Sequence, residues 1–86
     1  MSDPHVHSNH PALIARLKRA DGHLRSVIEM LETGKPCLDI AQQLHAVEKA
    51  VTNAKRALIH DHVDHCLDTE ASDTDRAELK LISRYL

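Results

Sequence analysis

Residues 36–67 read PCLDIAQQLHAVEKAVTNAKRALIHDHVDHCL, and this stretch decides the fold. Apolar side chains recur in it every three or four residues, which predicts one long amphipathic helix with a seam close to a heptad repeat. At a rise of 1.5 Å per residue, this helix is roughly 45–48 Å long. The seam consists of Cys37, Ile40, Leu44, Val47, Val51, Ala54, Leu58, His62 and Cys66.

The two ends of this seam carry residue types that bind metals. His62 and Cys66 are four residues apart, so one turn of helix points an imidazole and a thiol to the same side. Cys37 precedes His62 by 25 residues, which is roughly 37 Å along a straight helix. A site that uses all three residues therefore needs two antiparallel copies of the helix.

Such a pair of helices would form two identical metal sites. If the twofold axis passes near Ala50–Val51, Cys37 of one copy faces the other copy between His62 and Cys66. Two thiolates and one imidazole form a soft donor set that suits copper(I), nickel(II), cobalt(II) or zinc(II). The alternative interpretation is that both cysteines are ordinary buried thiols and that His62 is a surface residue.

The rest of the chain predicts two more helices and an N-terminal arm. Apolar residues recur at helical spacing from Leu13 to Leu31, which indicates a helix over about 9–33 that ends at Thr33-Gly34. A shorter helix over about 73–85 follows a polar break, with Ser72 as its cap. Residues 1–8 are expected to form a mobile arm, and residues 9–86 a single helical domain. The predicted fold class is all-α, with a three-helix protomer.

The size and composition of the chain favour an oligomer. Eighty-six residues with one aromatic side chain, Tyr85, provide little core volume, so we expect subunits to complete the core for one another. No apolar run approaches the roughly 18 residues of a membrane span, and no secretory signal pattern opens the chain. We therefore expect a protein of the bacterial cytoplasm, where two cysteines remain thiols and are ligands more often than a disulfide.

Charge is divided along the sequence. The net charge is −2, yet residues 13–56 carry eight Lys or Arg against five acids, whereas residues 57–78 carry seven acids against one arginine. The basic part suits contact with the phosphates of double-stranded DNA, although it could also be a solvated face. The sequence has no helix-turn-helix or zinc-finger pattern. The side chains expected to contact DNA are Arg16, Arg19, Lys49, Lys55 and Arg56.

Two other classes of function would use some of the same residues. A cytosolic metal chaperone or buffer would use the same ligands but would not need a basic face. An enzyme is disfavoured, because so small a helical chain offers no evident substrate pocket or oxyanion donors around Cys37 and His62. His65 follows Asp61 by four residues and is expected to face solvent in an ion pair.

Several short motifs occur together in this chain: Arg16-Leu17, Gly22-His23-Leu24, Met30-Leu31-Glu32, Cys37, Gln43, Ala46-Val47, His62 and Cys66. In this combination the chain resembles the CsoR/RcnR family of small helical bacterial repressors, which sense metals or reactive electrophiles. The resemblance implies a protomer that dimerises through an antiparallel four-helix bundle and pairs into a tetramer. It also implies that operator DNA is bound by the empty protein and released when the inducer binds. Arg16 and Arg19 fall on family positions implicated in operator binding, whereas Asn53 stands where some members have arginine.

The resemblance also bears on the identity of the inducer. Copper(I) members use only the three residues at the ends of the seam, commonly with a tyrosine just before the first cysteine, where this chain has Pro36. Nickel and cobalt members add an arm histidine 32 residues before that cysteine, which is His5 here, with His7 close enough to substitute. Four N/S donors suit planar nickel(II) or tetrahedral zinc(II). We therefore expect a nickel(II) or cobalt(II) sensor that uses His5, Cys37, His62 and Cys66, with a copper(I) sensor as the alternative.

Overall fold

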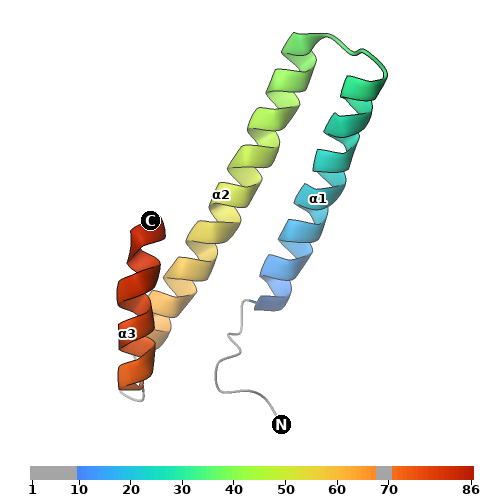
Figure 1. Cartoon of the computed structure of the whole chain (residues 1–86). Helices are drawn as coiled ribbons and strands as arrows, with labels where there is room; N and C mark the ends of the chain where they lie inside the picture. Colours follow the sequence, from blue (N-terminus) through green and yellow to red (C-terminus); the bar gives the residue numbers. More distant parts are fainter. Residues whose placement is uncertain (1–9, 68–70) are drawn as a thin grey trace.

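The computed structural model describes residues 10–67 and 71–86, which form three helices in the order α1 (His10–Glu32), α2 (Cys37–Leu67) and α3 (Asp73–Ile82), followed by a 3-10 turn, η1 (Ser83–Tyr85) (Figure 1). No strand occurs in these ranges, so the prediction of an all-α, three-helix protomer is confirmed. None of the described helices is both long and apolar enough to cross a membrane. The predicted N-terminal arm lies outside the described residues.

A tight turn reverses the chain between α1 and α2. Gly34 has a φ of 72°, a left-handed conformation in which a side chain would be strained. Its N–H donates to Leu31 O at 3.3 Å, and the N–H of Lys35 donates to Met30 O at 2.9 Å, which is the Schellman pattern. The main-chain oxygen of Pro36 then accepts from the N–H of Ile40 at 3.1 Å and starts α2. The two long helices consequently run antiparallel, side by side.

The core between α1 and α2 is formed by one heptad row from each helix. Where the two helices face each other, the buried residues of each recur seven apart, as expected when a helix packs on a single antiparallel neighbour. Val27 is only 1% exposed and packs with Ile40, Val47 and Met30. Burying a valine of this kind contributes about 2 kcal/mol. The two rows are Leu13, Ala20 and Val27 on α1, and Ile40, Val47 and Ala54 on α2.

A second heptad row on each helix stays open in the isolated chain. Its leucines and valine are 40–60% exposed, because the contact between α1 and α2 does not cover them. Together they form a larger apolar surface than isolated exposed residues would. Part of this surface forms a largely apolar groove of about 380 Å³. The open rows are Leu17, Leu24 and Leu31 on α1, and Leu44, Val51 and Leu58 on α2.

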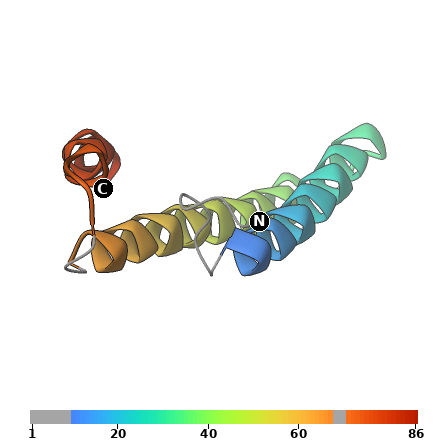
Figure 2. The same cartoon turned by 90° about the horizontal axis from the view of Figure 1, so that it is seen from below.

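α3 packs on the last turns of α2, on the side away from α1, and turns out of the plane of the two long helices (Figures 1 and 2). A capping box begins it: Ser72 Oγ accepts from the N–H of Asp75 at 3.1 Å, and the Asp75 carboxylate accepts from the N–H of Ser72 at 3.1 Å. Ile59 of α2 and Ala71 before the cap are both buried at this end. The first turn of α3 is thereby fixed over the C-terminal end of α2.

Candidate functional site

His62 and Cys66 lie together beneath α3. Both residues are buried, His62 at 5% and Cys66 at 9% exposure. His62 Nε2 is 3.1 Å from the main-chain oxygen of Asp75, and Cys66 Sγ is 3.3 Å from the same oxygen. One turn of α2 therefore brings an imidazole and a thiol onto one face, as the spacing predicts, and both reach a common acceptor.

The surroundings keep the Cys66 thiol protonated. Burial raises the pKa of Cys66, and the nearby charge of Asp75 raises it further, while Arg76 partly opposes the shift. The thiol also acts as the donor to the Asp75 oxygen, which stabilises the neutral form. Because a metal binds the thiolate, the binding of a metal at Cys66 must displace this proton to solvent.

The carboxylate of Asp75 is bound from two elements. Its Oδ2 atom accepts from the N–H of Ser72 at 3.1 Å, from the Ser72 hydroxyl at 2.9 Å, and from His65 Nε2 at 3.1 Å. These bonds, the Ser72 N–H first, lower the pKa of Asp75 to about 2. His65, expected to face solvent, is partly buried and contacts α3 instead. It links the end of α2 to the first turn of α3.

Cys37 lies at the other end of α2, where it is the first residue of the helix and is exposed. Within residues 10–67 and 71–86 of one chain, no three His, Cys, Asp or Glu side chains gather closely enough to hold a metal ion. His5 and His7 lie outside the described residues. The thiol and imidazole of the His62/Cys66 pair are donor types that suit a soft or borderline metal, but the pair by itself supplies only two donors.

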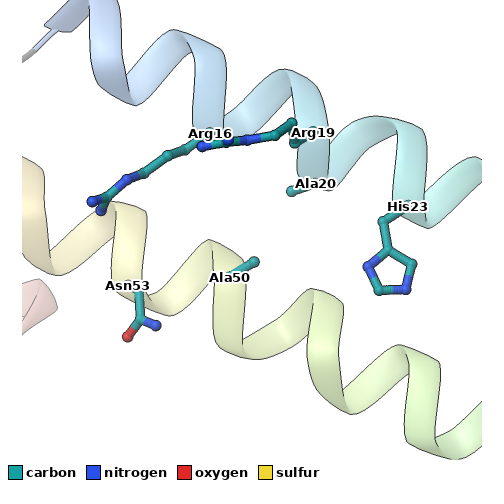
Figure 3. Close-up of a pocket in the computed structure, with 6 residues that line it drawn as sticks. All are labelled: Arg16, Arg19, Ala20, His23, Ala50 and Asn53. Carbon is teal, nitrogen blue, oxygen red and sulfur yellow. The ribbon is translucent and has the colours of Figure 1, made fainter.

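A basic groove of about 340 Å³ lies between α1 and α2. Figure 3 shows Arg16, Arg19 and His23 on α1, with Ala50 and Asn53 on the facing helix. His23 is fixed across the groove, because its Nε2 donates to Gln43 Oε1 at 2.6 Å. Among residues 10–67 and 71–86 no acid lines the groove, so two guanidinium groups and polar donors are available to an anion such as a phosphate. The lining residues are Arg16, Arg19, Ala20, His23, Ala50 and Asn53.

The three other basic residues expected to contact DNA are exposed on α2 but do not lie together. Lys49 and Arg56 are four before and three after Asn53, so they extend the same side of the helix. Lys55 instead lines the apolar groove beside Leu58. The tertiary structure thus unites Arg16 and Arg19 and separates Lys55 from them.

Two functional contacts have little or no signal in the sequence. The sequence predicts Ser72 as the cap of α3, and the structure confirms it, with Asp75 as the acidic partner of a Ser-x-x-acid capping box. The contact of the Asp75 main-chain oxygen with His62 and Cys66 has no local pattern, because α3 must first fold back on α2. The His23–Gln43 bond likewise joins residues 20 positions apart.

Comparison with known proteins identifies relatives for nearly the whole chain. Residues 9–85 match the family model described as metal-sensitive transcriptional repressor. The chain is 39% identical over 62 residues to the copper-sensing transcriptional repressor CsoR of Mycobacterium ulcerans (strain Agy99), an alignment that covers 72% of this chain and 53% of that protein. It is also 40% identical over 52 residues to the copper-sensing transcriptional repressor CsoR of Bacillus subtilis (strain 168). This alignment covers 60% of this chain and 52% of that protein. The chain thus matches about half the length of these relatives.

A solved structure resembles nearly the whole chain. It is that of the nickel-responsive transcriptional regulator InrS, with a TM-score of 0.78 and 30% sequence identity, over 98% of this chain and 100% of that one. The relatives therefore include proteins described as sensing copper and a protein described as responding to nickel.

Proposed function

Because the chain belongs to the family of metal-sensitive transcriptional repressors, we propose that it binds operator DNA when it is metal-free and releases the DNA when it binds a metal ion. Release would allow transcription of genes for metal efflux or resistance in a bacterial cytoplasm. The observation that carries the proposal is the buried His62/Cys66 pair at one end of α2, with Cys37 exposed at the other. Each chain then contributes half of two sites.

The open apolar rows support an arrangement in which two copies complete each site. Cys37, Leu44, Val51 and Leu58 recur seven apart on α2, so the exposed thiol belongs to the same row as the half-exposed apolar residues. Packing that row against a second, antiparallel copy buries the apolar surface and brings Cys37 to the partner's end of the bundle. We propose a four-helix-bundle dimer on this basis, and a tetramer formed from two such dimers.

DNA would be bound through the basic groove. Arg16 and Arg19 contribute guanidinium groups on the α1 wall, and Asn53 contributes an amide on α2. Side chains spread along helix surfaces in this way contact phosphates, which position a protein on the duplex without reading bases. Lys49 and Arg56 extend the positive surface along α2, while Lys55 lies farther around the helix. For metal to release DNA, the metal-bound assembly must favour an arrangement of the grooves that fits the duplex less well.

The inducer we propose is nickel(II) or cobalt(II). His5 would supply a fourth donor to Cys37, His62 and Cys66, or His7 would do so in its place. Four N/S donors suit nickel(II), and InrS, which resembles the chain over its whole length, is described as nickel-responsive. Copper(I) is the alternative, since the curated relatives are described as copper-sensing and three of these donors would satisfy it. Zinc(II) would accept the same four donors in tetrahedral geometry.

A metal chaperone or buffer is the alternative of another class. It would use the same thiol and imidazole donors, but it would gain nothing from a groove lined by two arginines. Binding to DNA upstream of the protein's own gene distinguishes the two functions, because a repressor is expected to bind this DNA and a chaperone or buffer is not.

The first experiment measures binding to that upstream DNA with and without metal. We expect the metal-free protein to bind and one metal among nickel(II), cobalt(II), copper(I) and zinc(II) to release it. Arg16→Ala should weaken DNA binding while leaving metal affinity nearly unchanged, and the affinity should fall steeply with salt as counterions are released. A complex insensitive to salt, or normal DNA binding by Arg16→Ala, would remove the basic groove from the mechanism.

The second experiment compares His5→Ala with His7→Ala. If the site has four donors, His5→Ala should weaken nickel(II) binding strongly and blunt nickel-dependent DNA release, while copper(I) binding remains almost as before. DNA release must be the readout, because copper outcompetes nickel at most such sites whatever the physiological inducer. Equal nickel responses in wild type and both variants would contradict the four-donor site and make copper(I) the leading inducer.

A further inference from the structure

His23 lines the basic groove with one of its ring nitrogens already bound. Its ring reaches from α1 toward the facing helix (Figure 3), one helical turn after Arg19. Its Nε2 contacts Gln43 Oε1 at 2.6 Å, and Gln43 lies beyond the residues that line the groove in the described part of the chain. Nδ1 is therefore the nitrogen that a ligand in the groove can reach.

The bond to Gln43 determines what Nδ1 can offer to such a ligand. An amide oxygen only accepts hydrogen bonds, so Nε2 carries the hydrogen of this contact. In the neutral imidazole Nδ1 then has a lone pair, which cannot bind a phosphate oxygen because that oxygen is also an acceptor. When the ring is protonated, Nδ1 becomes a donor on a positively charged group. His23 can therefore join the arginines in binding a phosphate only as imidazolium.

The groups around His23 couple its protonation to the presence of an anion. On α1 the charged groups of the groove are the guanidinium groups of Arg16 and Arg19. On α2 the polar groups are the amides of Gln43 and Asn53, which do not titrate. No carboxylate is among them within residues 10–67 and 71–86, so the negative charge that stabilises an imidazolium must come from a ligand. Protonation of His23 and binding of a phosphate therefore favour each other.

We propose, on the basis of the proposed DNA binding, that His23 is a further phosphate-binding residue and that it binds DNA as imidazolium. Each groove that binds a DNA phosphate then takes up a proton from solvent on Nδ1. Gln43 is a positioning residue, because it holds the Nε2 hydrogen and leaves only the protonated ring able to donate to the phosphate. DNA affinity should rise as the pH falls through the range in which histidines gain a proton, about pH 8 to 5, and should be lost again as the pH rises.

The affinity of the metal-free chain for the DNA upstream of its own gene tests this role, measured by fluorescence anisotropy at pH 8 and pH 6 and at constant ionic strength. On acidification the wild type should gain about tenfold more per occupied groove than His23→Gln, as expected for a hydrogen bond to a charged group. His23→Arg should bind at pH 8 about as tightly as the wild type at pH 6, because a guanidinium stays charged. The matched control is His45→Gln, which removes an exposed histidine of α2 outside the groove and should keep the wild-type response.

Gln43→Ala tests the positioning role separately. Without the Gln43 oxygen, a neutral His23 ring can carry its hydrogen on Nδ1 and donate to a phosphate without a proton from solvent. This variant should therefore bind DNA at pH 8 at least as tightly as the wild type and gain less on acidification. Binding that is weakened equally at both pH values would mean that Gln43 has only a structural role and would contradict the proposed positioning.

Calorimetry in buffers of different ionisation enthalpy counts the protons taken up on binding. At the same pH the wild type should take up more than His23→Gln, by at most about one proton per occupied groove. An equal pH response or an equal proton uptake in these two proteins, with helix content unchanged by circular dichroism, would overturn the role of His23 while leaving DNA binding itself intact. A wild type that binds this DNA at no pH would instead contradict the repressor function, and the role of His23 with it.

Discussion

Cys37 and Cys66 are the same residue type in opposite environments. Cys37 is exposed at the first turn of α2, whereas Cys66 is buried beneath α3 and donates its S–H to a carbonyl oxygen. Burial, with the charge of Asp75, raises the pKa of Cys66, so little of it is thiolate at neutral pH. The two thiols of the proposed site therefore differ in reactivity before any metal is bound.

Brief treatment of the metal-free protein with iodoacetamide should modify Cys37 first and Cys66 at least several-fold more slowly. The thiolate is the reacting species, and access to Cys66 requires movement of α3. Mass spectrometry of proteolytic fragments measures both rates, and in denaturant the two residues should react alike. Comparable rates in the native protein would mean that α3 does not cover Cys66.

At the scale of the helix, burial separates two heptad rows that the sequence pattern combines into one seam. On α2, Ile40, Val47 and Ala54 are buried against α1, whereas Leu44, Val51 and Leu58 remain 42–47% exposed. A helix packed on one neighbour buries one row, and a helix in a four-helix bundle buries both. The open rows therefore indicate how much of each helix remains for a second copy.

The turn between α1 and α2 depends on one glycine, and a second glycine provides its control. Gly34→Ala should destabilise the protein by about 1–2 kcal/mol, because alanine is strained at a φ of 72°. Gly22→Ala lies within α1, where an added Cβ has nothing within 4 Å, and it should stabilise by up to about 1 kcal/mol. Urea unfolding at a fixed protein concentration measures both changes. Loss of stability in Gly22→Ala would mean that another copy packs closely there.

At the scale of the whole molecule, the elongated shape prevents one chain from completing the proposed site. The extents are 54 × 29 × 14 Å, and α2 separates Cys37 from the His62/Cys66 pair by 25 residues or more of continuous helix. The thickness is close to that of a single helix, so apolar side chains remain open on its surface. Association of two copies would bring Cys37 of one chain to the His62/Cys66 pair of the other and would also bury the open apolar side chains.

Complementation between two inactive variants tests this arrangement. Cys37→Ala and Cys66→Ala chains, each unable to form a site, should regain metal binding when they are unfolded together and refolded. In the mixed dimer, one end combines the intact Cys37 of one chain with the intact Cys66 of the other. Random assortment should restore about a quarter of the wild-type sites, because half of the dimers are mixed and each has one intact end. A mixture that binds no more metal than either variant alone excludes the antiparallel pairing.

The sequence by itself determined the elements of this protein. Three helices, the turn at Gly34 and the cap at Ser72 follow from periodicity and capping, which depend only on residues a few positions apart. The same local rule placed His62 and Cys66 on one side of α2. The separation of Cys37 from them also follows from helix rise alone.

Only the tertiary structure decided which of these surfaces meet. The choice between the two heptad rows, the groove that unites Arg16 with Asn53, and the position of Asp75 over His62 all depend on how the helices pack. Such contacts join residues far apart in the chain and form wherever burial is greatest, so no local pattern specifies them. For this reason the sequence identified the donor atoms of the proposed metal site, while packing supplied the hydrogen bonds that orient them.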